Sequence, residues 1–92
     1  MIKQIDFPPD EQAQLQKQTE IVTTRVSKEY NRYHKGELVL SPWKELYVVS
    51  SVQKINEVKK HPYYKHLTVK QIRLISGYKR IDVIILKKAK TA

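Results

Sequence analysis

The sequence predicts a small α+β domain, in which short strands close into a mixed β-barrel with two short helices at its periphery. Three observations lead to this prediction. The chain has 92 residues, enough for one domain spanning residues 1–92 and too few for two. Its apolar residues fall in short segments that proline, glycine and polar residues separate. These segments follow the order strand, helix, three strands, helix, strand, and closure of the strands into a barrel would leave no strand edge unpaired.

Each element is predicted from its local pattern. Pro8 and Pro9 end a first apolar alternation, and Asp10 and Glu11 then favour the start of a helix. Runs of β-branched residues predict the middle strands. The predicted strands are residues 2–7, 21–26, 38–40, 46–52 and 78–86, and the predicted helices are residues 12–18 and 68–76.

The second helix has the strongest local signal. Thr68 and Gln71 have the spacing of a capping box, which satisfies main-chain N–H groups at a helix start. Val69, Ile72 and Ile75 recur at helical spacing, so we expect all three to pack against the barrel.

The last strand is predicted from strict alternation. Ile81, Val83 and Ile85 would face the core, and the residues between them would face the other way. Residues 87–92 contain three lysines and predict a loose basic tail.

The charge distribution indicates a polyanionic partner. Residues 1–46 contain seven basic and seven acidic side chains, whereas residues 47–92 contain eleven basic and two acidic ones. The whole net charge of +9 therefore lies in the second half. Lysine and arginine bind phosphate backbones and release condensed counterions, which favours nucleic acid as the partner. A generally soluble basic protein is the alternative.

Several classes of protein are disfavoured. The chain has no cysteine, which excludes thiolate metal sites, disulfides and cysteine nucleophiles. No apolar run has the length of a signal peptide or a membrane span, so we expect a cytoplasmic protein without a membrane partner. The three histidines lack metal-ligand spacing, and we expect no metal and no cofactor.

Two clusters mix aromatic and basic residues. One is residues 30–35 (YNRYHK) and the other is residues 63–66 (YYKH). Such clusters suit single-stranded nucleic acid, because bases stack on the rings and cations hold the phosphates. The alternatives are a polar turn before Gly36 for the first cluster and one core tyrosine in a solvated loop for the second.

Two segments carry a resemblance to a known family. Residues 20–25 (EIVTTR) resemble the K-T-x-T-x-R strand of ASCH domains, which belong to the PUA-like barrels, and residues 34–40 (HKGELVL) resemble that family's glycine–acid–aliphatic element. The helix and strand of residues 67–88 match its ending. The resemblance implies a PUA-like barrel whose cleft is lined by the T-x-R strand and by the loop before the glycine. It also implies a role in RNA metabolism.

Some small members of the family are acetylcytidine amidohydrolases, which use a lysine, a threonine and a glutamate. The resemblance places their threonine at Thr23, but their lysine at Glu20 and their glutamate near Lys65 or His66. A glutamate cannot supply the amine of a lysine, and a lysine cannot act as a carboxylate base. We therefore assign no catalytic residue and expect no hydrolysis of acetylated cytidine. Lys17 is the nearest alternative lysine.

These observations predict a domain that binds nucleic acid through a basic, tyrosine-containing cleft, with RNA favoured over DNA. Threonine hydroxyls would contact a base or sugar, cations would contact phosphates, and tyrosines would stack on bases. The predicted binding residues are Thr23, Thr24, Arg25, Arg32, Tyr33, Lys35, Tyr64, Lys65, Lys70 and Arg73. The alternatives are a modified-nucleoside amidohydrolase that uses the same cleft and a regulator that binds an acidic protein surface.

Overall fold

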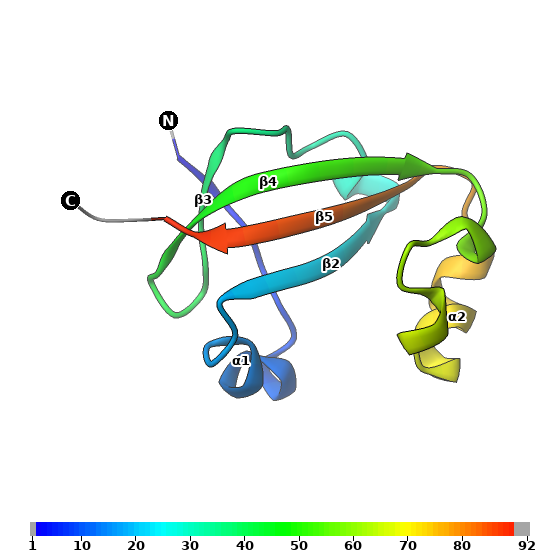
Figure 1. The fold of residues 1–92 in the computed structure, drawn as a ribbon, viewed down its shortest axis with the longest axis horizontal. Helices are drawn as coiled ribbons and strands as arrows, with labels where there is room; N and C mark the ends of the chain where they lie inside the picture. The colour runs from blue at the N-terminus through cyan, green and yellow to red at the C-terminus, as the bar shows by residue number, and fades with distance from the viewer. Residues whose placement is uncertain (1, 90–92) are drawn as a thin grey trace.

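A five-stranded mixed sheet organises the computed structural model, which describes residues 2–89 (Figure 1). Its strands are β1 (Lys3–Gln4), β2 (Glu20–Val26), β3 (Leu38–Leu40), β4 (Leu46–Ile55) and β5 (Ile81–Lys88). The helices are α1 (Pro9–Leu15) and α2 (Val69–Ser76), and short 3₁₀ turns lie at Ser27–Glu29, Val58–Lys60 and Tyr64–His66. The α+β class is confirmed, and both helices lie on the β2 side of the sheet (Figure 1).

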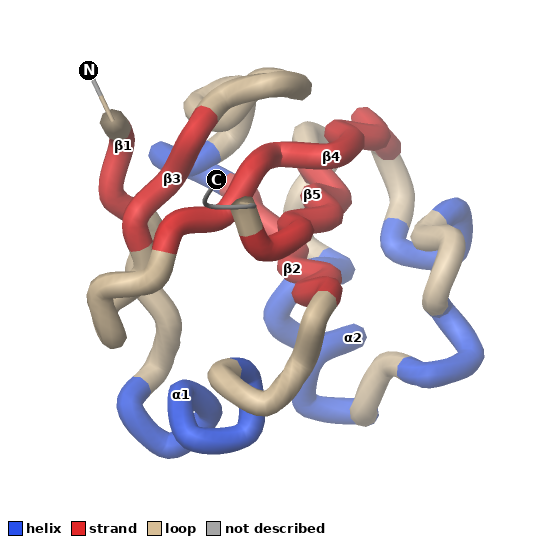
Figure 2. Tube along the Cα trace, turned by 60° about the vertical axis from the view of Figure 1, so that its left-hand side comes forward, coloured by secondary structure: helices blue, strands red, loops and turns tan. Residues whose placement is uncertain are grey.

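The strand order in space is β1-β3-β4-β5-β2, so β1 and β2 are the two edges of the sheet. β1 pairs with β3 in parallel, and every other pair is antiparallel. The long strands β4 and β5 form the centre, with a register shift between Val49 and Ser51 that increases the local twist. Figure 2 shows how the strands curl round one another.

The sheet is not closed into a barrel, because no ladder of main-chain hydrogen bonds joins β1 to β2. Side chains bridge these edges instead. The Arg25 guanidinium on β2 donates through one terminal nitrogen to the main-chain oxygen of Asp6, just after β1, at 2.8 Å. It also lies over the Phe7 ring, 4.9 Å from the ring centroid. The prediction of a mixed sheet with two peripheral helices is confirmed, and the barrel is not confirmed.

Two apolar clusters form the core. The larger lies inside the curl of the sheet, where Ile5 and Phe7 meet buried residues of β2 to β5, and the smaller joins Ile55, Ile81 and Val83 to Ile75 of α2. Ile81 and Val83 are buried in the smaller cluster as predicted, but Ile85 is only partly buried. Ile84 and Leu86 are buried in the larger cluster, because β5 is a central strand with both faces covered.

The α2 helix begins as predicted but packs differently. Thr68 Oγ1 accepts a hydrogen bond from Gln71 N–H, and the Gln71 side chain accepts one from Thr68 N–H, which confirms the capping box. Ile75 is buried, whereas Val69 is 66 % exposed, so its predicted packing is wrong. This short helix meets the end of the sheet, so only its Ile75 side reaches the core.

The remaining boundaries differ by a few residues. β1 covers only Lys3–Gln4 of the predicted first strand, and α1 ends at Leu15. Residues 87 and 88 of the predicted loose tail belong to β5, because they pair with β2 and β4, and residues 90–92 lie outside the described part of the chain. No helix within residues 2–89 is long and apolar enough to cross a membrane.

Candidate functional site

A cleft of about 680 Å³ runs beside the edge strand β2, and we call it the β2 cleft. Residues 22–26 of β2 line it, together with the turn into α1, α1 itself, the segment around His61 and Tyr63, and α2. Figure 1 shows the two helices flanking β2. The cleft therefore lies along one of the two edges of the sheet, the β2 edge.

The main chain of β2 is open toward this side. In an antiparallel ladder, only every second residue of a strand forms main-chain hydrogen bonds with the partner strand. The hydrogen bond from Lys88 N–H to the Thr19 carbonyl shows which residues of β2 form these bonds with β5. Val22 and Thr24 fall on the alternate positions, so their N–H and C=O groups point away from β5. Neither residue's main chain has a hydrogen-bond partner among the described residues. Two donors and two acceptors are thus available along the cleft.

The Thr24 hydroxyl is held as a donor by His61. His61 Nδ1 accepts a hydrogen bond from the Tyr63 N–H at 3.0 Å, which places the proton of the neutral ring on Nε2. That Nε2–H lies 2.9 Å from Thr24 Oγ1 and donates to it. Burial lowers the pKa of His61 below 6.5, which favours this neutral form. His61 therefore cannot take the proton of Thr24, and the Thr24 hydroxyl keeps its own proton to donate to a ligand.

Arg25 and Thr23 line the cleft, and their side chains are hydrogen-bonded to each other. Arg25 Nε donates to Thr23 Oγ1 at 3.1 Å, and its second terminal nitrogen pairs with Glu29 at 2.8 Å. Together with the bond to the Asp6 carbonyl, these contacts occupy all three guanidinium nitrogens, and Arg25 is buried. The prediction that Arg25 contacts phosphate is corrected by these contacts, because the side chain bridges the sheet edges.

Apolar and aromatic side chains form the α2 wall of the cleft. Gln71, Leu74, Ile75 and Tyr78 line it at helical spacing, from one side of α2 and the residue beyond it. Leu74 is 65 % exposed and Tyr78 is 41 % exposed, which is unusual for large apolar groups on one wall. This wall offers a flat apolar surface to a ligand.

The β2 cleft is not basic, unlike the cleft that the sequence predicts. Three carboxylates line it, from Asp6, Glu11 and Glu29. Arg25 already pairs with Glu29, and no lysine lies among the described residues that line the cleft. The surplus of positive charge in the second half of the chain therefore lies outside the cleft.

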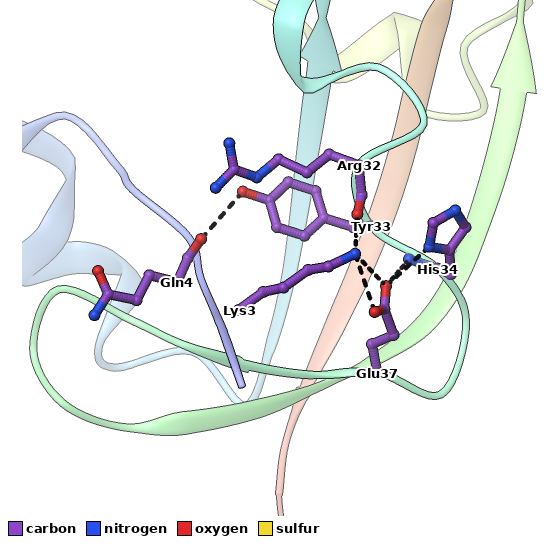
Figure 3. Close-up of polar contacts among 6 residues, drawn as sticks. All are labelled: Lys3, Gln4, Arg32, Tyr33, His34 and Glu37. Carbon is purple, nitrogen blue, oxygen red and sulfur yellow. Dashed lines mark hydrogen bonds and ion pairs between the residues drawn. The ribbon is translucent and has the colours of Figure 1, made fainter. Parts of the chain in front are cut away.

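The loop of residues 30–36 was expected to border the cleft, but its residues 32–34 lie against β1 (Figure 3). Glu37 organises it, accepting hydrogen bonds from Lys3 Nζ and from the His34 N–H. These bonds, led by the one from Lys3, lower the pKa of Glu37. The Tyr33 ring is 1 % exposed, and its hydroxyl donates to the Gln4 carbonyl.

The predicted stacking role of Tyr33 is therefore wrong, because burial in the core leaves no ring face for a base. Burial also raises the pKa of Tyr33 above its ordinary value. Arg32 and Lys35 are exposed and do not line the cleft, so the predicted loop contacts there are corrected as well.

The structure brings together three of the ten predicted residues, Thr23, Thr24 and Arg25. The other second-half residues, Tyr64, Lys65, Lys70 and Arg73, lie on the segment around the cleft without lining it. Tyr63 and His66 of the predicted 63–66 cluster also line the cleft, whereas sequence reasoning missed His61 and Tyr78. The four-residue spacing of Leu74 and Tyr78 was a visible signal, but an apolar stripe of this kind equally predicts a core face.

The positions that the resemblance gave to catalytic groups are dispersed. Glu20 is exposed and lies 3.9 Å from Lys87, and neither Glu20, Lys17 nor Lys65 lines the cleft. Within residues 2–89, no group of three or more histidine or acidic side chains is placed to hold a metal ion. Comparison of the chain with family models, curated proteins and solved structures finds no match.

Proposed function

We propose that this domain binds single-stranded RNA by taking an uncharged base into the β2 cleft and holding phosphates on the basic surface outside it. The observation that carries the proposal is the open main chain of β2, with a threonine hydroxyl fixed as donor beside it. Base edges present fixed patterns of donors and acceptors, which such groups match.

The composition of the cleft supports this division of roles. A base is planar and neutral, so it fits between apolar walls, and acidic groups would repel a phosphate there. The Thr24 hydroxyl also suits the 2′-hydroxyl of ribose, which both donates and accepts hydrogen bonds. This favours RNA over DNA. Lys65, Lys70 and Arg73 flank the cleft and are proposed as phosphate contacts.

We further propose that the fold is a PUA-like barrel of the ASCH type in which closure is incomplete. The five-stranded curl with its helices is consistent with this proposal, as is the cleft lined by Thr23 and Arg25 of the T-x-R strand. In this view Arg25 takes the place of the missing ladder between the edge strands. A structure with bound RNA oligonucleotide would test both the fold assignment and the cleft.

Fluorescence anisotropy of short single-stranded RNA at several salt concentrations tests the binding. Four to six phosphate contacts at about 0.7 each would give a log–log salt slope of roughly −3 to −4. Tyr78→Ala removes an exposed ring from the cleft wall, and we expect it to weaken binding by about 1–3 kcal/mol with the salt slope unchanged. A DNA strand of the same sequence is the control for sugar preference.

Tyr64, which the sequence predicts to stack on a base, lies outside the β2 cleft, so Tyr64→Ala is the matched control for the proposed base site. Equal losses in the two variants would contradict a base site in the cleft. If the wild-type protein binds RNA no tighter than about 100 μM at low salt, weaker than non-specific binding usually is, the RNA proposal fails.

A protein partner is the second candidate, and the free edge of β2 favours it. An extended peptide can add a strand to such an edge, with its side chains in neighbouring pockets. Val22 and Tyr78 would supply exposed apolar contacts. An amidohydrolase has less support, since no lysine lines the described cleft, and we expect acetylated cytidine to stay intact with the purified protein.

A further inference from the structure

A second hollow, of about 470 Å³, lies at the far end of β4 and carries the charge that the cleft lacks. Its lining includes three lysines, Lys54, Lys60 and Lys79, and no carboxylate among the described residues. Tyr30 forms part of its wall, and the amides of Gln53 and Asn56 also face it. We call this the lysine hollow.

Lys54 is held in a fixed position at this hollow. Its Nζ lies 3.0 Å from the Asp82 carboxylate and 4.3 Å from the centroid of the Tyr30 ring. Asp82 is fully buried and also accepts the Asn31 N–H at 2.6 Å, which fastens the Tyr30 loop to β5. A lysine clamped in this way loses little rotamer freedom when an anion binds.

Lys60 and Lys79 have no ion-pair partner among residues 2–89. Their charges add at the hollow, whereas that of Lys54 is offset by the Asp82 carboxylate beneath it. A concave site with surplus positive charge and amide donors attracts a phosphate group.

The lysine hollow shares a wall with the β2 cleft. At three places one residue lines the cleft and its neighbour in the chain lines the hollow, namely Glu29 and Tyr30, His61 and Lys60, and Tyr78 and Lys79. Consecutive Cα atoms are about 3.8 Å apart, so the two sites meet along one ridge. At these three places the two sites are therefore neighbours, as a base and its adjacent phosphate would require.

We infer that the lysine hollow binds a phosphate of the nucleic-acid strand whose base occupies the β2 cleft. This inference rests on the proposed function and assigns the phosphate contact to Lys60 and Lys79. Because Lys54 is already paired with Asp82, it orders the site, and the two unpaired lysines supply the net charge.

The test is the salt slope of RNA binding in the double variant Lys60→Gln/Lys79→Gln. Loss of two contacts should make the slope shallower by about 1.4 units, at 0.7 per contact. The control is Lys17→Gln/Lys44→Gln, which removes the same charge from residues that line neither site. Equal changes in both double variants would overturn the inference and leave RNA binding itself intact.

A second measurement separates the two proposals. Titration of the ¹⁵N-labelled protein with pyrophosphate should shift the amide signals of Tyr30, Asn56 and Lys79, and titration with uridine should shift those of Val22 and Thr24. If pyrophosphate shifts these amide signals but the protein binds no RNA, the lysine hollow is an anion site and the proposed function is refuted. The absence of pyrophosphate shifts at the hollow would refute the inference in a protein that still binds RNA.

Discussion

At the scale of single residues, His61 decides what the cleft can do chemically. The Tyr63 N–H fixes its tautomer, and the His61 Nε2–H donates a hydrogen bond to the Thr24 hydroxyl. A threonine beside a histidine in a cleft invites a catalytic interpretation, but this hydrogen-bond direction rules out His61 as the base for Thr24. The pair instead presents a hydroxyl donor, as a binding site requires.

The lowered pKa of His61 predicts how stability depends on pH. As the pH falls below about 6.5, the unfolded chain takes up a proton at this residue before the folded protein does. The free energy of unfolding should therefore begin to fall as the pH drops from about 7 through 6.5, where a histidine of the unfolded chain titrates. In His61→Gln this decrease should be smaller in urea unfolding series. His66→Gln, which alters an exposed ring, should keep the wild-type decrease.

At the scale of elements, β5 and α2 show that an apolar pattern does not by itself decide how far its residues are buried. β5 pairs with β4 on one side and with β2 on the other, and Val83 is 1 % exposed. α2 has a correct start signal and helical spacing, yet Val69 at its first turn is 66 % exposed. The place of each element relative to the sheet, rather than its apolar pattern, accounts for this difference in burial.

A matched pair of substitutions tests this contrast. Val83→Ala should lower the free energy of unfolding by about 1–3 kcal/mol, because it leaves a cavity in a central strand. Val69→Ala removes the same atoms from an exposed position and should change stability by less than about 0.5 kcal/mol. Urea denaturation of the two variants measures both values. Similar losses would contradict the burial described for α2.

At the scale of the whole molecule, a polar network around Arg25 links the two edges of the open sheet. Arg25 links the segment after β1 to β2, and Glu29 links Arg25 to the Tyr33 hydroxyl. That hydroxyl reaches the Gln4 carbonyl on β1. This network spans both edges of the sheet and, through Arg25 and Glu29, lines the cleft, so stability and cleft shape depend on the same contacts.

Arg25→Lys should therefore be costly although it keeps the charge. A lysine ammonium cannot reproduce three nitrogens in a planar fork, and the partners left unpaired are partly buried. We expect a loss of about 2–3 kcal/mol in the free energy of unfolding, together with faster amide exchange in β2. Arg32→Lys, at an exposed position, should stay within about 0.5 kcal/mol of the wild type.

The sequence by itself determined what depends on near neighbours in the chain. The capping box at Thr68, the α+β class and four of the five strands to within a few residues follow from local spacing and propensity. The charge asymmetry is likewise a property of composition. These features were predictable because their physical causes act over a few residues.

Only the tertiary structure decided where that charge and those aromatic rings lie. The curl of the sheet buries Tyr33, binds Arg25 to the opposite edge, and turns the 30–36 loop toward β1. It also places Lys60 and Lys79 at the lysine hollow, which is separate from the carboxylate-lined β2 cleft. Contacts between residues so far apart in the chain arise from the packing of strands, so they cannot be predicted from local sequence patterns.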